Sequence, residues 1–472
     1  MTLPLNKRRL FLGSVAFAVV TLALLLLGRL LLAGWMVSSL LQLGGASQIK
    51  LNVTEATPWR VVVEGLGFQV RSQAFAAQRV TIARRHWWLP SLGAVRIEQA
   101  RVPLTIDGSD TNPWSWSTYQ NGRAKVQPWQ VPLEELDVEG ILVVQAAALP
   151  AREVPGKITA RLDRRHIWKL NAEADGPGLS LQGEGRYDVA QDELVFQLPV
   201  VALDLKTWGI FVRRLVLLPG GPWKLAGKFT GSAEGRLAGR KLTTSGTVRW
   251  RDGQATKMTG LAVHASGIEG ELEFSDLAQI ITKPGRLRIR EVSAGQLVLR
   301  NLEVAMALAG AHKVAVSRVS FQALGGTVTV EPFNYFPGLR EVEAVMQVDG
   351  IGLGEIMALT HDLPVQVSGR MNGHLPVRID ERGLRFGTGW MELTPGFPAN
   401  LELTTGDTRK LRLTELRLDI RPPNAPPGCS ARLHVAGAPL VSTDGTPVLL
   451  DLNVSGPLER FLHLDSPTRI RD

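Results

Sequence analysis

The feature that most constrains this chain is an alternation of apolar and polar residues, which is its dominant pattern from residue 49 onward. In Leu287-Arg288-Ile289-Arg290 every second residue is apolar, and the stretch Leu297–Val304 continues similarly. Successive side chains of a β-strand point to opposite faces, so this pattern predicts strands with one apolar and one wetted face. Helical patterns are scarce, so the apolar faces must cover one another or be covered by something else.

The alternation changes parity near residue 414. Leu411 and Leu413 share one face, and after Thr414-Glu415 the apolar positions continue at Leu416 and Leu418. A shift of this kind is typical of a β-bulge or a tight turn.

Turns with glycine separate the apolar runs at short intervals, and they predict hairpins between antiparallel neighbours. Examples are residues 174–178, 251–253, 380–383 and 443–445. Two segments, Ser275–Thr282 and Leu353–His361, each have room for about two helical turns. We therefore expect a mainly β, antiparallel fold with few short helices.

An apolar run stands at the N-terminus. Lys7–Arg9 are followed by Leu10–Leu27, which contains no charged residue, and only Arg29 interrupts before the run ends at Gly34. A run of this length predicts a transmembrane helix over residues 10–34. Basic residues that flank a first span stay in the cytoplasm, so residues 1–9 are expected there and the bulk of the chain on the far side.

Three other interpretations of this run are weaker. A cleaved signal peptide has a shorter apolar core and a small-residue cleavage site, and no such site follows. Leu32-Ala33-Gly34 resembles a lipoprotein cleavage box, but Trp35 stands where that box needs cysteine. Arg8-Arg9 resembles a twin-arginine export signal, although basic residues beside a membrane helix are the simpler explanation. We expect an uncleaved anchor.

Composition and motifs exclude several classes of protein. The single cysteine, Cys429, leaves no internal disulfide and no cysteine-based metal site. The net charge of +9 is dispersed, which suits an anionic membrane surface better than nucleic acid for an exported domain. The histidines are far apart in sequence and form no H-E-x-x-H pair, and neither a phosphate loop nor a G-x-S-x-G elbow is present. We expect no catalytic residues, no metal and no cofactor.

Residues 270–396, about a quarter of the chain, resemble a known family. The segments that carry the resemblance are Gly270–Leu277, Lys283–Ile289, Gly325–Pro332, Asp349–Ile356, Leu363–Gly369 and Gly373–Ile379. They look like the C-terminal domain of YdbH-type proteins of the AsmA-like superfamily, a domain often labelled a dicarboxylate-transport domain. The segment Leu51–Arg60 is similar to the start of the same family's exported region.

The resemblance implies a bacterial inner-membrane protein with a single span and with its bulk in the periplasm. The fold would be a long, curled antiparallel β-sheet that forms a trough, with an AsmA-like region over residues 45–265 and a YdbH-like domain over 266–472. Phospholipids would move along the apolar inner face between the inner and outer membranes. A small outer-membrane lipoprotein that adds strands to an open edge is the partner that the resemblance implies.

The alternating aliphatic residues supply candidates for the floor of such a groove. They are Leu287, Ile289, Leu299, Val328 and Val330. Two rival hypotheses stay open. One is a membrane-anchored envelope scaffold built of β-sandwiches, because a sandwich core shares the same alternation. The other is a transporter component for a soluble substrate, which fits poorly because one span forms no translocation pathway without partners.

Overall fold

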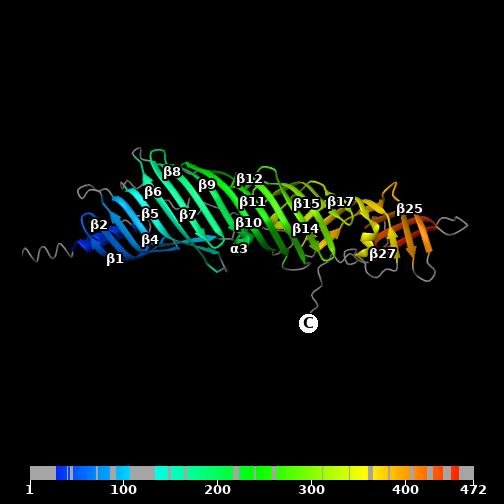
Figure 1. Ribbon diagram of the computed structural model, residues 1–472, viewed down its shortest axis with the longest axis horizontal. Helices are drawn as coiled ribbons and strands as arrows, with labels where there is room; N and C mark the ends of the chain where they lie inside the picture. The colour runs from blue at the N-terminus through cyan, green and yellow to red at the C-terminus, as the bar shows by residue number, and fades with distance from the viewer. Residues whose placement is uncertain are drawn as a thin grey trace, which may run out of the picture. The chain divides into compact units, whose positions relative to one another are not determined.

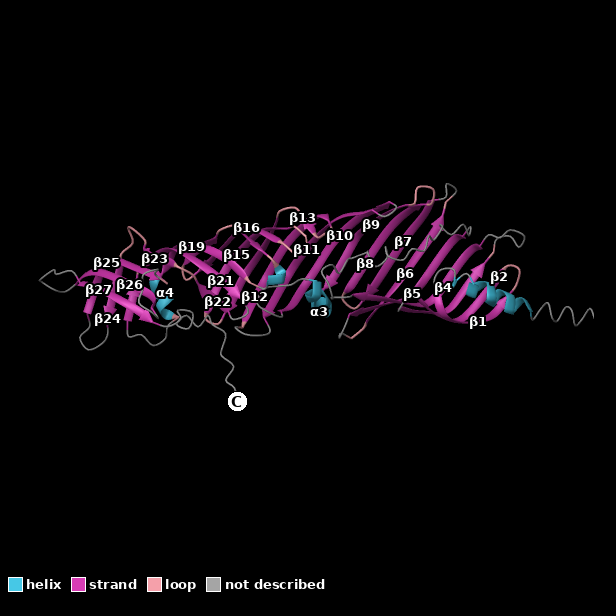
Figure 2. Ribbon diagram, turned by 180° about the vertical axis from the view of Figure 1, so that it is seen from behind, coloured by secondary structure: helices cyan, strands magenta, loops and turns pink. Residues whose placement is uncertain are grey.

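Strands dominate the part of the chain that the computed structural model describes. That part comprises residues 28–39, 41–42, 46–70, 73–84, 92–106, 133–146, 150–163, 167–215, 223–238, 241–257, 262–310, 312–339, 341–359, 365–380, 383–403, 409–421, 429–439 and 448–455. Figure 2 shows these strands in magenta and the scarce helices in cyan. The expected mainly β fold with few helices is confirmed.

Contacts between residues divide the chain into two compact units. The first comprises Met1–Val201 with Glu234–Leu242, and the second comprises Ala202–Ala233 with Thr243–Asp472. The two sequence regions expected from the family resemblance, 45–265 and 266–472, meet within strand β12 (Val263–Asp276). That division of the sequence stays a prediction.

The first unit contains a sheet whose strands pair in chain order from β1 to β8. The bounds are β1 Ala46–Ala56, β2 Arg60–Val70, β3 Gln73–Ala83, β4 Leu92–Ile106, β5 Leu133–Ala146, β6 Arg152–Leu162, β7 Ile167–Gly176, β8 Leu179–Asp188 and β9 Glu193–Asp204. Figure 1 shows β4 to β8 side by side in this order.

One strand pair corrects the expectation of a purely antiparallel sheet. Strands β4 and β5 run parallel, with Ile97 opposite Val138, whereas the other pairs from β1 to β8 are antiparallel. A parallel pair needs a crossover of about a dozen residues or more, too long for a hairpin turn. Residues 107–132, which separate the two strands in sequence, provide that length.

The second unit contains a longer antiparallel series, in which the order is β11, β12, β14, β15, β16, β17, β19, β21, β23, β25, β26 and β27. Its main strands are β10 Trp223–Ala238, β11 Lys241–Lys257, β12, β14 Gly285–Ala294, β15 Leu297–Leu308, β16 Val314–Ala323, β17 Gly326–Val330, β19 Val342–Gly352, β21 Arg370–Asp380, β23 Gly389–Leu393, β25 Arg409–Ile420, β26 Cys429–Pro439 and β27 Val448–Ser455. Shorter strands pair beside them, namely β13 Ile281–Thr282, β18 Phe333–Tyr335, β20 Val365–Ser368, β22 Gly383–Phe386 and β24 Ala399–Leu403.

The parity shift expected near residue 414 is confirmed as a bulge. In the pairing of β25 with β26, Leu413 lies opposite Gly437 and Glu415 lies opposite Ala436, so Thr414 is the extra residue. Its hydroxyl donates a hydrogen bond to the Ala436 carbonyl oxygen over 3.1 Å. The bulge returns Leu416 to the face of Leu413, because it cancels the change of parity.

Two local features differ from those that the sequence predicts. Residues 251–253 form no hairpin turn but lie within β11, where Asp252 adopts a left-handed conformation with φ of 51°. The segment Ser275–Thr282 contains no helix, because the Asp276 carboxylate accepts hydrogen bonds from the backbone N–H groups of Ala278 (2.9 Å) and Gln279 (3.1 Å). This side chain stabilises a turn between β12 and β13 instead.

The described helices are short. Helix α4 (Leu353–Ala358) confirms the helix expected in Leu353–His361, whereas α3 (Leu205–Leu215) was not expected. Residues 28–39 form a further helix, and its residues 28–34 are the described part of the expected anchor; residues 1–27 lie outside the described residues. Among the described helices, none combines the length and the apolar character that a membrane crossing requires.

Candidate functional site

A continuous apolar ladder crosses the first unit. Residues directly opposite each other on paired strands share one face of the sheet. From β1 to β8 one set of such partners is Val53, Val63, Val80, Ile97, Val138, Ile158, Ala172 and Gly183. We call the face that bears them the first apolar face.

The N-terminal end of the first apolar face is covered. Val63 is 0% exposed and Val80 is 7% exposed. Val37 and Leu41, from the helical segment that precedes β1, pack against this cluster. Figure 2 shows this helix beside β1 and β2. The segment supplies the apolar cover here, and burying one valine contributes about 1.5–3 kcal/mol.

Farther along the same ladder the first apolar face is open. Ile158 is 49% exposed, although its partners across the sheet, Val138 and Ala172, are apolar. No residue of β7 is fully buried, and Leu170 is only half-buried. The opening is local, because Ala160 and Val154, on the same face of β6, are 3% and 0% exposed.

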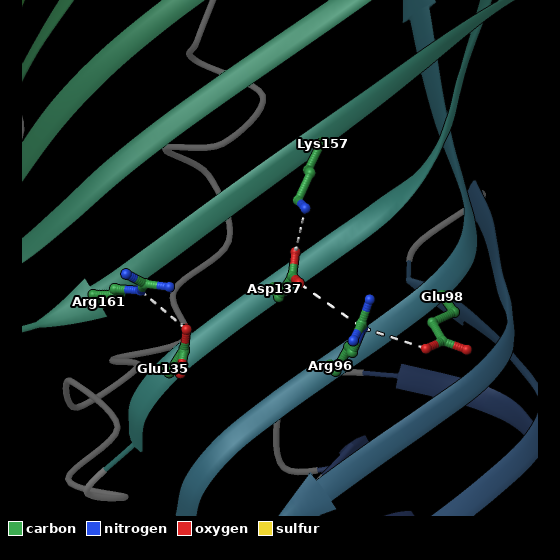
Figure 3. Close-up of polar contacts among 6 residues, drawn as sticks. All are labelled: Arg96, Glu98, Glu135, Asp137, Lys157 and Arg161. Atoms are coloured by element: carbon green, nitrogen blue, oxygen red, sulfur yellow. Dashed lines mark hydrogen bonds and ion pairs between the residues drawn. The ribbon is translucent and has the colours of Figure 1, made fainter.

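The opposite face of the first unit is charged. Figure 3 shows the ion pairs that join Arg161 to Glu135 over 3.0 Å and Arg96 to Glu98 over 3.3 Å. Asp137 lies 3.8 Å from both Arg96 Nε and Lys157 Nζ. Exposed pairs of this kind contribute about 0–1 kcal/mol each. Their main consequence is that this face stays wetted, so an apolar ligand has one face of the sheet available.

The second unit has a comparable ladder, which contains two of the five predicted groove residues, Leu287 and Val330. Leu287 lies opposite Val304, and the ladder continues across β16, β17, β19 and β21. The further partners are Val319, Val330, Met346 and Leu375. Ile289 and Val328 lie two residues from Leu287 and Val330, so they share this second apolar face.

Leu299 lies on the second apolar face as well. It is opposite Ala323, which stands two residues from Phe321, and Phe321 is opposite Val328. The alternation of β15 changes parity at Asn301, whose φ of 52° is left-handed. The structure thus places Leu287, Ile289, Leu299, Val328 and Val330 on one face.

Exposure divides the five residues. Val328 is 4% exposed and belongs to a closed core that includes Val348, Met371 and Leu375. The other four are half-buried, and no residue of β14 or β15 is fully buried. The second apolar face is therefore closed at Val328 and over β19 and β21, and partly open at Val330 and over β14 and β15.

Helix α3 covers a further part of the second unit. Leu205, at its first position, is 1% exposed and packs with Leu225, Ala255 and Ile268. Leu287 and Ile289 pack against the same cluster. This helix is not among the predicted elements, although Asp204 before it is a common N-cap residue and accepts a hydrogen bond from the Lys206 N–H over 2.9 Å.

None of the five predicted groove residues lies on the first apolar face. The signal was present in β6, where Ile158 and Ala160 alternate with Lys157 and Arg161. Within a short strand such a pattern identifies a face, but it does not show whether that face is open.

Titratable groups form no reactive cluster in the described residues, and no group of His, Cys, Asp and Glu there is arranged to hold a metal ion. His434 interacts with two carboxylates. Its Nδ1 lies 2.7 Å from Asp451 Oδ1 and its Nε2 lies 4.0 Å from Glu415 Oε2. The hydrogen bond to Asp451 raises the pKa of His434 above its ordinary value.

Comparison with known proteins gives one match. A family model described as "YdbH-like: Intermembrane phospholipid transport protein YdbH" matches residues 135–396, which is more than half of the chain and extends from β5 to just beyond β23. No curated protein and no solved structure matches the chain.

Proposed function

Because the chain belongs to the YdbH-like family of intermembrane phospholipid transport proteins, which are not enzymes, we propose that its apolar sheet faces conduct phospholipids between the inner and outer membranes of a bacterial envelope. One observation carries this proposal. The ladder that is fully buried at Val63 is 49% exposed at Ile158, so apolar surface is available to a ligand at this position of β6.

Acyl chains would provide the missing cover. Removing apolar surface from water is favourable by about 25 cal/mol per Å², so a lipid tail on this face replaces a costly contact with water. A row of similar aliphatic side chains offers the tail successive positions of similar free energy. Leu287, Ile289, Leu299 and Val330 would form the floor in the second unit, with Val328 at the border of its closed core.

The proposed location is the inner membrane, with residues 10–34 as a single span, 1–9 in the cytoplasm and the remainder in the periplasm. The helix over residues 28–39 supports this assignment. Leu31, Leu32 and Trp35 are 78%, 63% and 68% exposed, although all three are apolar. Val37 packs against the sheet, so the exposed residues present an apolar surface that suits contact with lipid.

The proposed partner is a small outer-membrane lipoprotein that pairs with β27. Among the described residues β27 pairs with β26. It also exposes Leu449, Leu450 and Leu452 to 69%, 43% and 44%. An apolar strand with an available edge is a template for a strand from another chain.

Bound lipid tests the proposed function. The full chain is purified, and its phospholipid is quantified by mass spectrometry for the wild type, Leu299→Asp and Arg300→Asp. Arg300 is exposed and follows Leu299 directly, so its side chain lies on the other face. We expect the wild type and Arg300→Asp to carry phospholipid and Leu299→Asp to lose it. A wild-type chain without lipid, or equal lipid in both variants, would contradict the proposal.

A further inference from the structure

Lys257 interrupts the second apolar face. It is the last residue of β11, two positions beyond Ala255, which is 7% exposed in the cluster around Leu205. Because alternate residues of a strand share a face, the Lys257 side chain lies on the apolar side. Thr256 lies opposite His264, so the nearest position on β12 for Lys257 is Val263.

The surroundings of Lys257 contain no compensating charge in the described part of the chain. The side chain is half-buried and has no hydrogen bond or ion pair there. Val263 is opposite Ala294, and Ala294 is opposite Leu297, so the adjoining ladder is apolar. Burial lowers the pKa of Lys257, which means that the site disfavours the ammonium group as it stands.

Arg152 has a corresponding position on the first apolar face. It is the first residue of β6, opposite Val144 and two positions from Val154, which are 4% and 0% exposed. Its Nε atom is buried and has no hydrogen-bond partner in the described residues. On the polar face of the same strand, Arg161 pairs with Glu135 over 3.0 Å. Arg152 is thus a basic side chain on the apolar face of the sheet, whereas carboxylates such as that of Glu135 lie on the opposite face.

We propose that Arg152 and Lys257 each bind the phosphate group of a phospholipid whose acyl chains lie on the adjacent apolar face. This inference rests on the proposed function. Both residues stand at a strand end, at the edge of an apolar face. An amphiphile needs an apolar surface for its acyl chains and, next to it, a polar contact for its head group. A phosphodiester provides the anionic oxygens that an unpaired guanidinium or ammonium group lacks, and charge-assisted hydrogen bonds of this kind are the strong ones.

The experiment uses the full chain and two probes. One is a vesicle that contains phosphatidylglycerol with a fluorescent acyl chain, and the other contains diacylglycerol with the same labelled chain. The variants are Arg152→Gln and Lys257→Met. The controls, Arg186→Gln and Lys224→Met, remove exposed basic residues from the opposite face, which have no ion pair among the described residues.

We expect each variant to bind phosphatidylglycerol about tenfold to a hundredfold more weakly, the loss expected for one charge-assisted hydrogen bond. Both variants should bind diacylglycerol as tightly as the wild type does. Both controls should bind phosphatidylglycerol as tightly as the wild type does. The melting temperature of Lys257→Met should not fall, because the substitution removes an unpaired, half-buried charge. A lower melting temperature together with weaker binding of both lipids would indicate a structural role and overturn the inference.

The other outcomes are also separable. If the wild type binds phosphatidylglycerol and the variants bind it equally well, the inference is wrong and the proposed function stands. If the wild type binds neither lipid, the proposed function itself fails. Inorganic phosphate in excess should not displace the labelled lipid, since it lacks acyl chains; displacement would assign the two residues to free phosphate and overturn the lipid interpretation.

Discussion

Val63 and Ile158 lie on one cross-strand ladder of the first unit, yet Val63 is fully buried and Ile158 is 49% exposed. The difference does not come from the residues on the ladder, which are aliphatic at both positions. It comes from cover: Val37 and Leu41 pack over the end that contains Val63. The same pattern of sequence therefore makes a core at one place and an open apolar surface at another.

Aspartate at two positions of the second apolar face should separate its closed and open parts. Val328→Asp places an unpaired charge in a closed core and should lower the free energy of unfolding by about 3–5 kcal/mol. Leu299→Asp should cost about 1 kcal/mol or less, because a half-buried carboxylate keeps contact with water. Thermal melting of both variants measures the difference. Equal losses of stability would show that Leu299 also lies in a closed core.

Gly140 tests the parallel pairing of β4 with β5. A Cβ atom at this position would lie 2.1 Å from the carbonyl oxygen of Ala100, so the strands approach too closely for any side chain. We expect Gly140→Ala to lower stability by about 1–3 kcal/mol. The control is Gly67→Ala, where an added Cβ would meet nothing within 4 Å. Similar melting temperatures for the two variants would be evidence against the close approach.

His434 should make the attachment of β27 depend on pH. Its hydrogen bond to Asp451 raises the pKa of His434, so the charged pair stabilises β27 fully below the unfolded pKa of about 6.5. That contribution is lost as pH rises through the higher pKa of the folded state. Hydrogen exchange of the β27 amides should therefore show more protection at about pH 5 than at about pH 8.

The controls for this effect are His434→Gln and Asp451→Asn, each of which removes one partner of the pair. Both should abolish the pH dependence in β27 and leave the amides of β14 unaffected. A pH dependence that persists in both variants would mean that another group is responsible.

The N-terminal run predicts an uncleaved anchor. Residues 10–33 should remain attached to the mature chain, because the apolar core is long and no small-residue cleavage site follows it. Sequencing of the mature N-terminus by mass spectrometry measures this directly. A mature chain that begins beyond Ala33 would contradict the prediction.

Much of the fold could be predicted from the sequence because strand patterns are local. The bulge at Thr414 follows from the shifted positions of Leu413 and Leu416. The hairpin at residues 176–179 is likewise visible as Gly176-Pro177-Gly178, which joins β7 to β8.

The errors arise where a local pattern has two structural solutions. Asp252-Gly253 is typical of a turn. Here the left-handed Asp252 lies at a register shift within β11, and β11 stays paired with β12 before and after it. The parallel pairing of β4 with β5 depends on contacts between residues far apart in sequence, such as Ile97 and Val138, which no local pattern records.

The candidate site was only half predictable for the same reason. Alternation places Leu287, Leu299 and Val328 on an apolar side, and the structure brings them to one face. It does not distinguish the buried Val328 from the half-exposed Leu299, because burial depends on the second layer that packs over a strand.

Crosslinking at Ile158 and Lys169 tests whether phospholipid lies on the first apolar face. A photoreactive amino acid is placed at either position in the full chain, which is irradiated in bacterial cells and then analysed by intact mass spectrometry. Ile158 lies on the open apolar face, whereas Lys169 is exposed on the polar face of the neighbouring strand, opposite Arg161. We expect phospholipid adducts at Ile158 and none above background at Lys169. No adduct at Ile158, or equal adducts at both positions, would contradict it.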